Sequence, residues 1–585
     1  MIKLIKKLNK KQLLCMFICV VFITIQVCLD LKLPDYMTSI TTLVQTKGSH
    51  MSDILIEGAK MMLCAFGSLI SAFITGYYAA YVAASFGRNL RRDIFVSVEN
   101  FGMEEIKKFS TSSLITRTTN DVTQVQMLIA LGLQVMVKAP IMAVWAICKI
   151  AGKNFYWSLS TIIAVSIILL VIIIIIKLAL PKFRKIQMLT DNLNRVTREN
   201  LKGIRVVRAY NAEDYEKNKF DEANKDLTYT QMFAQRMMSM MSPVMSLTSS
   251  GLTLAIYIIG AYLINAAGFM DRISLFSNMV VFISYAMQVI VAFMLLIMIF
   301  VIYPRSAVAA KRIVEILDTR SSIESGSITK SNSNYEGTVE FKNVSFKYPD
   351  AESYMLRDIS FKAKKGQTVA FIGSTGSGKS TLINLIPRFY DATEGEILVD
   401  GINVKDYKIE CLNDKIGYVP QKAVMFAGTV NSNISYGKVK NKKVDKVKIK
   451  EAAKISLAEE FINKMDKEYE SHIAQGGTNI SGGQKQRLQV ARAIAKNPEI
   501  YIFDDSFSAL DYKTDSTLRK NLKKYTKDAT ILIVAQRIGT IMNADNIIVL
   551  DEGKIVGNGN HKKLMESCEV YKEIALSQLS EEELR

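Results

Sequence analysis

Histidine is scarce in this chain of 585 residues, which contains only His50, His472 and His561. Its seven cysteines are an odd number, without a CxxC pair or a nearby histidine cluster. A disulfide framework and a zinc site are therefore both poor interpretations. An acidic surplus is also absent, because 74 Lys and Arg stand against 55 Asp and Glu, a net charge of +19. Such a basic chain suits nucleic acid or a membrane surface, and the positions of the charges must decide.

Long apolar runs occur only in the first half of the chain. Six runs before residue 310 approach or exceed the roughly 20 residues that cross a bilayer. They are Leu13–Leu31, Ile54–Phe86, Met127–Ile150, Phe155–Leu180, Leu247–Ala267 and Phe276–Tyr303. We expect the first to be a retained signal anchor, because lysines precede it and no small-residue cleavage site follows.

The connections after the second and fourth runs are too long for simple turns, and both are rich in basic residues. Their helical patterning predicts that the spanning helices continue well into the cytoplasm. The first connection holds Arg88, Arg91, Arg92, Lys107, Lys108 and Arg117. Positive charge marks the cytoplasmic side, so we expect a multi-pass protein of the cell membrane with both termini cytoplasmic. Topology then explains much of the net charge, which argues against a nucleic-acid partner.

The composition changes after residue 317. Residues 318–337 are rich in Ser, Asn and Gly and indicate a linker. From residue 338 short β-rich segments alternate later with helices, which is typical of an α/β domain. We therefore expect an all-α membrane domain over residues 1–317 and an α/β domain over residues 338–585.

A phosphate-binding loop is the clearest motif of the second half. The strand Gln367–Ile372 leads into a glycine-rich loop and then a helix beginning near Thr381. The loop consists of Gly373, Ser374, Thr375, Gly376, Ser377, Gly378, Lys379 and Ser380. Its backbone N–H groups can surround phosphate oxygens, Lys379 can reach the β- and γ-phosphates, and Ser380 offers a hydroxyl to Mg²⁺. The α/β domain is thus predicted to be a P-loop ATPase that uses ATP and Mg²⁺.

Two later segments extend this prediction. The apolar strand Ile500–Asp504 ends in a carboxylate suited to Mg²⁺ and its water shell. A second glycine-containing helix start, which would also bind an anion, consists of Ser481, Gly482, Gly483 and Gln484.

Together these motifs resemble those of an ATP-binding cassette (ABC) transporter half of the exporter type, with six spans fused to one nucleotide-binding domain. The resemblance covers nearly the whole chain. It implies that Tyr348 stacks on adenine, that Gln421 senses Mg²⁺ beside Ser380 and Asp504, and that Ser508–Asp511 is the D-loop. It also implies coupling helices near Phe109–Ile115 and Tyr210–Tyr215. In this family two domains close head to tail, so each ATP lies between one P-loop and the partner's signature.

The sequence departs from the family pattern where hydrolysis is expected. The family has a glutamate after the Mg²⁺-associated aspartate and a histidine after a later strand, whereas this chain has Asp505 and Gln536. Gln475 likewise replaces a glutamate before the signature. Because small misplacements cost large factors in rate, we expect weak hydrolysis at this site. The alternative is that Asp505 still serves as the base. The chain resembles the degenerate-site subunit of heterodimeric bacterial multidrug exporters, whose partner would supply a complete catalytic site.

The substrate is less well defined. Aromatic and methionine side chains of the last two spans, among them Tyr257, Tyr262, Phe282, Tyr285, Met287, Phe293 and Met294, would line an adaptable apolar cavity or simply pack the helices. Lys138 would face a cavity or reach the outer surface. The favoured function is ATP-driven export of hydrophobic or amphipathic compounds, drugs or lipids, by alternating access. The alternatives are a homodimeric lipid or peptide exporter and an ATP-gated or regulatory membrane subunit.

Overall fold

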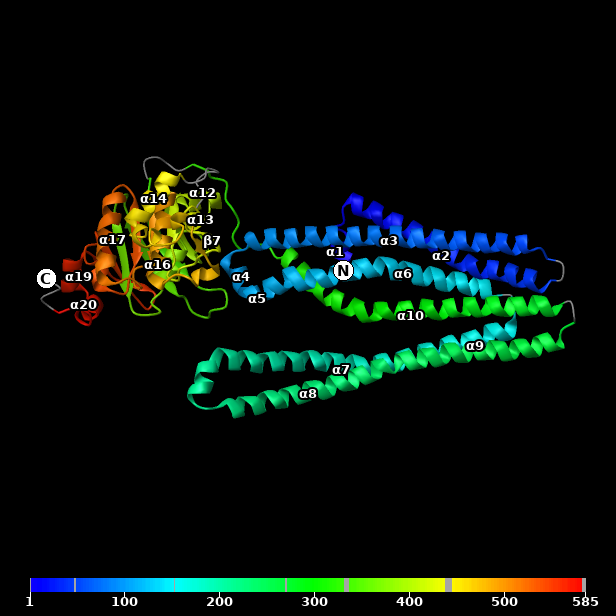
Figure 1. Ribbon diagram of the computed structural model, residues 1–585. Helices are drawn as coiled ribbons and strands as arrows, with labels where there is room; N and C mark the ends of the chain where they lie inside the picture. The colour runs from blue at the N-terminus through cyan, green and yellow to red at the C-terminus, as the bar shows by residue number, and fades with distance from the viewer. Residues whose placement is uncertain are drawn as a thin grey trace. The chain divides into compact units, whose positions relative to one another are not determined.

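The structure, a computed structural model, describes residues 2–46, 49–151, 153–268, 271–330, 336–436 and 445–580 (Figure 1). The chain forms two compact units. The first comprises Met1–Val98 with Ser112–Thr319, and the second comprises Glu99–Thr111 with Arg320–Arg585. Each unit is described by itself. The predicted boundaries at 317 and 337 remain predictions, and residues 331–335 of the predicted linker lie outside the described residues.

The first unit is helical in its described part. Its short elements are α1 (Ile2–Ile5), α5 (Thr111–Thr116) and a π-helical turn, Arg117–Asp121. Its long helices are α2 (Lys10–Gln45), α3 (Met51–Glu99), α6 (Val122–Ile150), α7 (Phe155–Ala209), α8 (Glu213–Ser239), α9 (Met241–Ala266) and α10 (Asp271–Asp318). Six helical segments are long and apolar enough to cross a membrane, by length and composition, and they contain or overlap the six predicted runs. The expected extension of the helices beyond the apolar runs is also observed, most clearly in α3 and α7.

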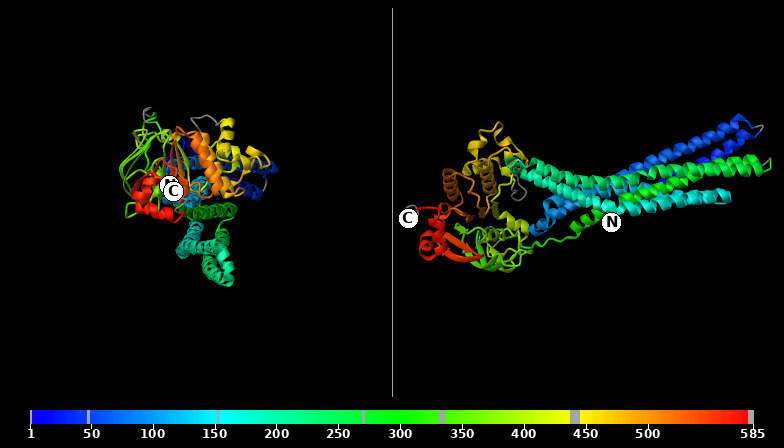
Figure 2. Two further views of the ribbon diagram at one scale, coloured as in Figure 1. Left: turned by 90° about the vertical axis from the view of Figure 1, so that its left-hand side faces the viewer. Right: turned by 90° about the horizontal axis from the view of Figure 1, so that it is seen from below.

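The packing of the first unit separates a buried core from an apolar exterior. Trp157, Phe282, Tyr285, Ile23 and Val27 are buried where α2, α6, α7, α9 and α10 meet. The outward faces instead expose large apolar side chains, such as Leu63, Leu69 and Phe73 of α3 at 63–76% exposure. An apolar exterior of this extent suits lipid rather than water. In Figure 1 and in the left view of Figure 2, α8 and the part of α7 beside it lie apart from α3 and α6.

Two sheets form the centre of the second unit. A four-stranded antiparallel sheet has the order β2-β1-β4-β5, and a six-stranded, mainly parallel sheet has the order β12-β11-β3-β10-β9-β6. The strands of the first are β1 (Val339–Phe346), β2 (Leu356–Ala363), β4 (Glu394–Val399) and β5 (Ile402–Asn403). Those of the second are β3 (Thr368–Gly373), β6 (Ile416–Val419), β9 (Ile500–Asp504), β10 (Thr530–Val534), β11 (Asn546–Asp551) and β12 (Lys554–Gly559). A short pair, β7 (Gly428–Thr429) and β8 (His472–Ile473), lies outside them.

Helices accompany these strands, as the predicted α/β class requires. In chain order they are α11 (Lys379–Asn384), α12 (Ile409–Asp414), α13 (Val430–Ile434), α14 (Lys446–Ile455), α15 (Glu459–Ile462), α16 (Gly482–Lys496), α17 (Tyr512–Tyr525), α18 (Ile538–Ile541), α19 (His561–Ser567) and α20 (Glu569–Leu576). The strands β3, β9 and β10 are buried on both faces, which is why they read as continuous apolar runs.

The second unit also includes a helix from far upstream, α4 (Met103–Phe109). The carboxylate of Glu105 accepts hydrogen bonds from the backbone N–H of Gly102 at the start of the helix (2.8 Å) and of Ser322 (3.0 Å). Ser110 has a φ of 57°, so the helix cannot continue into α5. The predicted segment Phe109–Ile115 therefore contains the last residue of α4, Phe109, and most of α5, from Thr111 onward, and its coupling role stays a prediction.

Candidate functional site

The predicted nucleotide residues gather at one edge of the six-stranded sheet. Parallel strands present their carboxyl ends on the same side, and here β3, β10 and β9 are neighbours. Val534 of β10 pairs with both Phe371 of β3 and Asp504 of β9. The residues that follow these strands therefore emerge side by side, although they are far apart in the sequence.

Glycine is required in the loop between β3 and α11 for two different reasons. Gly378 has a φ of 95°, and a Cβ there would lie 2.7 Å from a methyl group of Leu356. A Cβ at Gly373 would lie 1.9 Å from the carbonyl oxygen of Leu550. Gly376 differs, because its Cβ would meet no described atom within 4 Å. The loop is thus held tightly at both ends and is open in the middle.

Lys379 lies inside this loop and is nearly buried. Its Nζ donates to the carbonyl oxygens of Gly373 (2.9 Å) and Ser374 (2.7 Å) and to Oγ of Ser377 (3.3 Å). Burial lowers the pKa of the Lys379 ammonium, while Asp505 and Asp504 act in the opposite direction. The ammonium is therefore already in the cradle, held by groups that a phosphate can replace.

Ser380 and Asp504 meet across the sheet edge, as predicted. Ser380 Oγ donates to Asp504 Oδ1 at 2.8 Å. Burial raises the pKa of the Asp504 carboxyl, and the Ser380 hydrogen bond opposes that rise. A hydroxyl and a carboxylate are the oxygen ligands that Mg²⁺ prefers. The open loop, the inward ammonium and this oxygen pair fit a magnesium-bound triphosphate.

The next carboxylate, Asp505, has different partners. Its Oδ2 accepts from Nε2 of Gln536 (2.9 Å) and from Nε2 of Gln421 (3.2 Å). Its backbone N–H donates to the carbonyl oxygen of Val534 at 2.9 Å, and its φ of 46° turns the chain there. Burial raises the pKa of the Asp505 carboxyl, opposed chiefly by the hydrogen bond from Gln421. The structure thus brings together two of the three departures from the family pattern, Asp505 and Gln536, and the predicted Mg²⁺ sensor Gln421. The amide of Gln421 contacts Asp505 and not the Ser380–Asp504 pair.

Tyr348 lies beside the loop, but its ring is engaged. Its hydroxyl is 3.0 Å from Oγ1 of Thr381, and its ring contacts those of Phe346 and Tyr390 edge to face. The ammonium of Lys107, from α4, lies 5.5 Å from the ring centroid, within the range of a cation–π contact. The sequence analysis placed Lys107 among topology-setting charges only, and nothing in the local pattern links it to Tyr348.

The signature segment forms a capped helix start. Ser481 Oγ accepts from the backbone N–H of Gln484, and Gln484 Oε1 accepts from the N–H of Ser481 (2.9 Å), so the pair is a capping box at the start of α16. Ser481 and Gly482 are exposed, which leaves this helix start accessible. Asp511, at the end of the predicted D-loop, caps α17 through the N–H of Thr514 at 2.9 Å.

Comparisons with known proteins agree with this geometry. The family descriptions "ABC transporter transmembrane region" and "ABC transporter" match residues 16–293 and 356–508. An uncharacterized ABC transporter ATP-binding protein of Mycobacterium tuberculosis is 39% identical over 518 residues, which cover 88% of this chain and 87% of that protein. The chain belongs to the ABC transporter family. It is an exporter half, with a helical transmembrane domain fused to an ABC-type ATPase domain, and ABC exporters of this kind work as dimers in a lipid bilayer.

Other relatives extend the comparison. The uncharacterized ABC transporter ATP-binding protein YfiB of Bacillus subtilis is 35% identical over 530 residues, 90% of either chain. An ATP-dependent lipid A-core flippase of Aromatoleum aromaticum is 30% identical over 548 residues, 90% of this chain and 86% of that protein. The structure of a bacterial Atm1-family ABC exporter with ATP bound superposes with a TM-score of 0.79 and covers 96% of this chain and 98% of that one. At 21% identity that likeness shows the fold alone.

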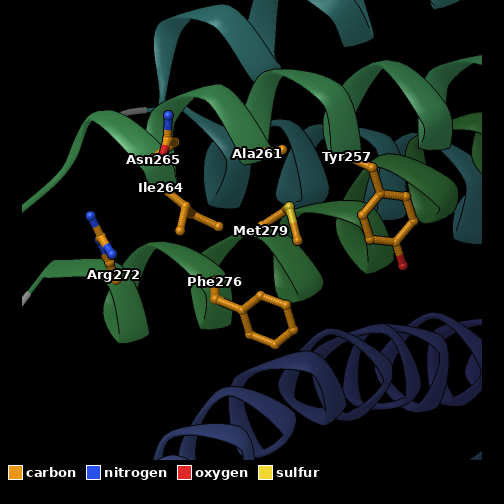
Figure 3. A pocket seen from close by; sticks show the side chains of 7 residues that line it. All are labelled: Tyr257, Ala261, Ile264, Asn265, Arg272, Phe276 and Met279. Atoms are coloured by element: carbon orange, nitrogen blue, oxygen red, sulfur yellow. The ribbon is translucent and has the colours of Figure 1, made fainter. Parts of the chain in front are cut away.

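The membrane residues singled out from the sequence do not all line a cavity. Phe282 and Tyr285 are buried in helix packing. Tyr257 lines a pocket of about 530 Å³ between α9 and α10, together with Ala261, Ile264, Asn265, Arg272, Phe276 and Met279 (Figure 3). Lys138 is paired with Asp30 of α2 at 3.4 Å. The sequence analysis missed Asp30, although a carboxylate at the end of an apolar run was a signal for it.

Proposed function

We propose that this chain is one half of a heterodimeric exporter that moves hydrophobic or amphipathic compounds, drugs or lipids, across the cytoplasmic membrane. It would bind ATP firmly and hydrolyse it slowly at its own P-loop. The positive charge of the two long connections supports cytoplasmic termini.

The observation that carries the slow hydrolysis is the double amide contact to Asp505. A general base must reach the attacking water and accept its proton. Oδ2 of Asp505 already accepts from Gln421 and Gln536, and aspartate is one methylene shorter than the glutamate of the family pattern. Neutral Gln536 cannot carry the charge of a histidine. Both changes weaken the positioning of water, and a displacement of about 1 Å can cost on the order of a hundredfold in rate.

The binding side of the site is intact by comparison. Backbone N–H groups of the loop and of the α11 N-terminus would hold phosphate oxygens. Lys379 would exchange its carbonyl partners for the β- and γ-phosphates, and Ser380 and Asp504 would hold Mg²⁺ and its water shell, with Tyr348 against the adenine. Mg²⁺ held by Ser380 and Asp504 would supply positive charge to offset that of the phosphates. These residues would therefore retain ATP without requiring its rapid turnover.

A complete signature supports the heterodimer. Ser481, Gly482, Gly483 and Gln484 present an accessible helix start with its own capping box. Placed against a partner's P-loop, this start would bind that nucleotide's phosphates. A partner that carries a catalytic glutamate would then hydrolyse ATP at that second site, while this chain's site stays occupied.

Two features support an amphipathic cargo. Lipid A-core flippases are among the relatives at 30% identity over most of the chain. The pocket between α9 and α10 combines apolar side chains with Asn265 and Arg272. An apolar pocket with a few polar groups suits a molecule with an apolar body and a polar head.

The test is ATP hydrolysis by this chain purified alone in lipid vesicles. We expect a slow native chain and, for Asp505→Glu combined with Gln536→His, a gain of ten- to a hundredfold, since the base regains its reach. Lys364→Ala, an exposed lysine of the same domain, is the control for handling of the protein. Brisk hydrolysis by the native chain would show that Asp505 is a competent base and would remove the main support for a heterodimer.

A second assay separates the pump from a channel or a regulatory subunit. Inverted vesicles containing the assembled exporter should accumulate a fluorescent phospholipid analogue or a hydrophobic dye only with ATP. Dissipation of a gradient without accumulation would favour the ATP-gated alternative.

A further inference from the structure

Helix α2 carries two carboxylates within its apolar sequence, and α6 supplies a lysine to each. Lys138 Nζ lies 3.4 Å from Asp30 Oδ2, and Lys149 Nζ lies 2.7 Å from Asp35 Oδ2. Asp30 and Lys138 are each about a quarter exposed. Charges in a membrane-spanning segment are costly unless they are paired, and they usually serve a function.

Pro34 separates the two carboxylates and opens the backbone between them. A proline inside a helix has no N–H, so the carbonyl oxygen four residues earlier, that of Asp30, loses its helical donor. Nε2 of Gln288, in α10, donates to this oxygen at 3.3 Å. The hydroxyl of Tyr285, one turn earlier in α10, donates to Asp35 Oδ1 (2.5 Å) and to the carbonyl oxygen of Leu31 (3.1 Å). The break in α2 is thus repaired by α10.

A fourth helix joins the same group, because the hydroxyl of Ser68 in α3 donates to Asp30 Oδ1. We name this group the Pro34 junction, and its members are Asp30, Pro34, Asp35, Ser68, Lys138, Lys149, Tyr285 and Gln288. The Asp30–Lys138 pair and the buried hydroxyl of Tyr285 are the shielded parts of this junction, whereas the side chains of Asp35 and Lys149 are each 41% exposed. A shielded ion pair or hydrogen bond tolerates little displacement, because a separated partner stays unpaired. The junction therefore fixes α2, α3, α6 and α10 in one arrangement.

The contacts of α10 with α7 and α9 have a different character. The ring of Trp157 in α7 lies 5.5 Å from that of Phe282, and both are buried. Gly260 of α9 is so close to Met279 that a Cβ would lie 2.2 Å from its sulfur. In the described part of these helices, Ser249 Oγ of α9 donates a weak hydrogen bond to Met287 Sδ of α10 (3.1 Å). Lys153, an exposed residue just before α7, also donates to Asn278 Oδ1 of α10 at 3.5 Å. Apolar faces of this kind can slide without leaving a charge unpaired.

We propose that Asp30 and Asp35 are positioning residues of the transport cycle. Through the Pro34 junction they keep α2, α3, α6 and α10 together as one body while nucleotide binds. The nucleotide-driven displacement in the membrane unit then occurs at the apolar face of α10 toward α7 and α9. This inference rests on the proposed binding of ATP by the second unit, which is measured separately below.

The two tryptophans of the chain report on the two sides of this boundary. Trp157 lies at the apolar face, and Trp145 lies in α6, one turn before Lys149. The experiment adds a non-hydrolysable ATP analogue and Mg²⁺ to the full chain in lipid nanodiscs and records the tryptophan emission. Trp145→Phe, at a partly exposed position, leaves Trp157 as the single fluorophore. We expect the same emission change in the native chain and in Trp145→Phe, because only Trp157 responds.

Breaking one ion pair should make α6 respond as well. Two Asp35→Asn chains are compared, one with Trp145 and one with Trp145→Phe. On binding of the analogue, the emission of the chain with Trp145 should change more. Exchange of the charges, Asp35→Lys with Lys149→Asp, should restore the native equality. The control is Asp53→Asn, an exposed carboxylate in the first turn of α3, which should leave the equality intact.

Any of three results would overturn the proposal. The emission of Trp157 could stay unchanged when the analogue binds, or the emission of Trp145 in the native chain could change. The emission of Trp145 could also stay unchanged in the Asp35→Asn chain. Binding of the radiolabelled analogue is measured in every preparation. An absence of binding would contradict the proposed function instead, so the two failures are distinguishable. Thermal melting of each variant in the same nanodiscs identifies chains that have lost their fold. If Asp35→Asn is among them, the same emission measurement is made on Asp30→Asn with Trp145 retained.

Discussion

Two adjacent carboxylates at one sheet edge have opposite surroundings. Asp504 accepts from the Ser380 hydroxyl, whereas Asp505 accepts from the amides of Gln421 and Gln536. A hydroxyl can exchange its partner for a metal ion, while two amide donors already occupy one of the two carboxylate oxygens of Asp505. On the proposed function, this difference would assign the binding and the hydrolysis of ATP to separate side chains that are only one residue apart along the chain.

Lys379 and Asp505 also differ in whether a bound nucleotide could replace their present hydrogen-bond partners. Lys379 is held by carbonyl oxygens, and on the proposed function a phosphate would replace them with stronger, charge-assisted hydrogen bonds. The donors to Asp505 are neutral and lie within the folded domain, from β10's exit and from the segment after β6. Variants that alter one side and leave the other unchanged should therefore separate the two functions.

The largest effect should come from the binding side. Lys379→Ala removes charge-assisted hydrogen bonds to phosphate that are worth about 1.5–3 kcal/mol each. We expect affinity for ATP to fall on the order of a hundredfold, which corresponds to about 2.7 kcal/mol. Equilibrium binding of radiolabelled ATP to the chain in lipid measures it, with Lys364→Ala as the exposed-lysine control. Unchanged affinity would mean that the loop does not bind phosphate through Lys379.

The binding side of this comparison was predictable from the sequence. The loop Gly373–Ser380 has its residue types at fixed spacing between a strand and a helix, so the local pattern predicts its conformation. The six apolar helices and the α/β class follow from segment length and composition in the same way. What the pattern did not place was the carbonyl-bound position of Lys379 and the contact of Tyr348 with Thr381.

For the hydrolysis residues, the sequence predicted only which positions depart from the family pattern and not which side chains meet. That Gln536 donates to Asp505 depends on the parallel register in which Val534 lies beside Asp504, a contact between separate strands. The grouping of α4 with the second unit depends on Glu105 reaching Ser322, more than two hundred residues later. The Pro34 junction likewise needs four helices in place. Such pairings come from tertiary packing, which a single sequence does not encode by periodicity.

A smaller effect should follow from Lys107, which contacts the ring of Tyr348, the residue proposed to lie against adenine. Its ammonium lies 5.5 Å from the centroid of the Tyr348 ring, and a cation–π contact at an exposed site is worth about 0.5–1 kcal/mol. Lys107→Met should therefore weaken ATP binding about two- to fivefold, because the ring loses one of the contacts that orient it. The matched control is Lys108→Met, whose ammonium lies over Phe109 at 5.9 Å. An equal loss in both variants would assign the effect to the charge of α4 and not to Tyr348.

The smallest effect tests the catalytic side directly. If the two amides prevent Asp505 from acting as a base, then Asp505→Asn should change the slow hydrolysis of the native chain by less than about threefold, against the 10²–10⁴ that a working base contributes. The hydrolysis rate is also compared in chains that carry Gln536→His, with either glutamate or glutamine at position 505. There, Asp505→Gln with Gln536→His should be at least about tenfold slower than Asp505→Glu with Gln536→His, since glutamine keeps the length but accepts no proton. Phosphate release by each chain, corrected for bound ATP, measures both steps. A large loss in native Asp505→Asn would make Asp505 the base despite its two amide partners, and the separation of binding from hydrolysis at this sheet edge would then be wrong.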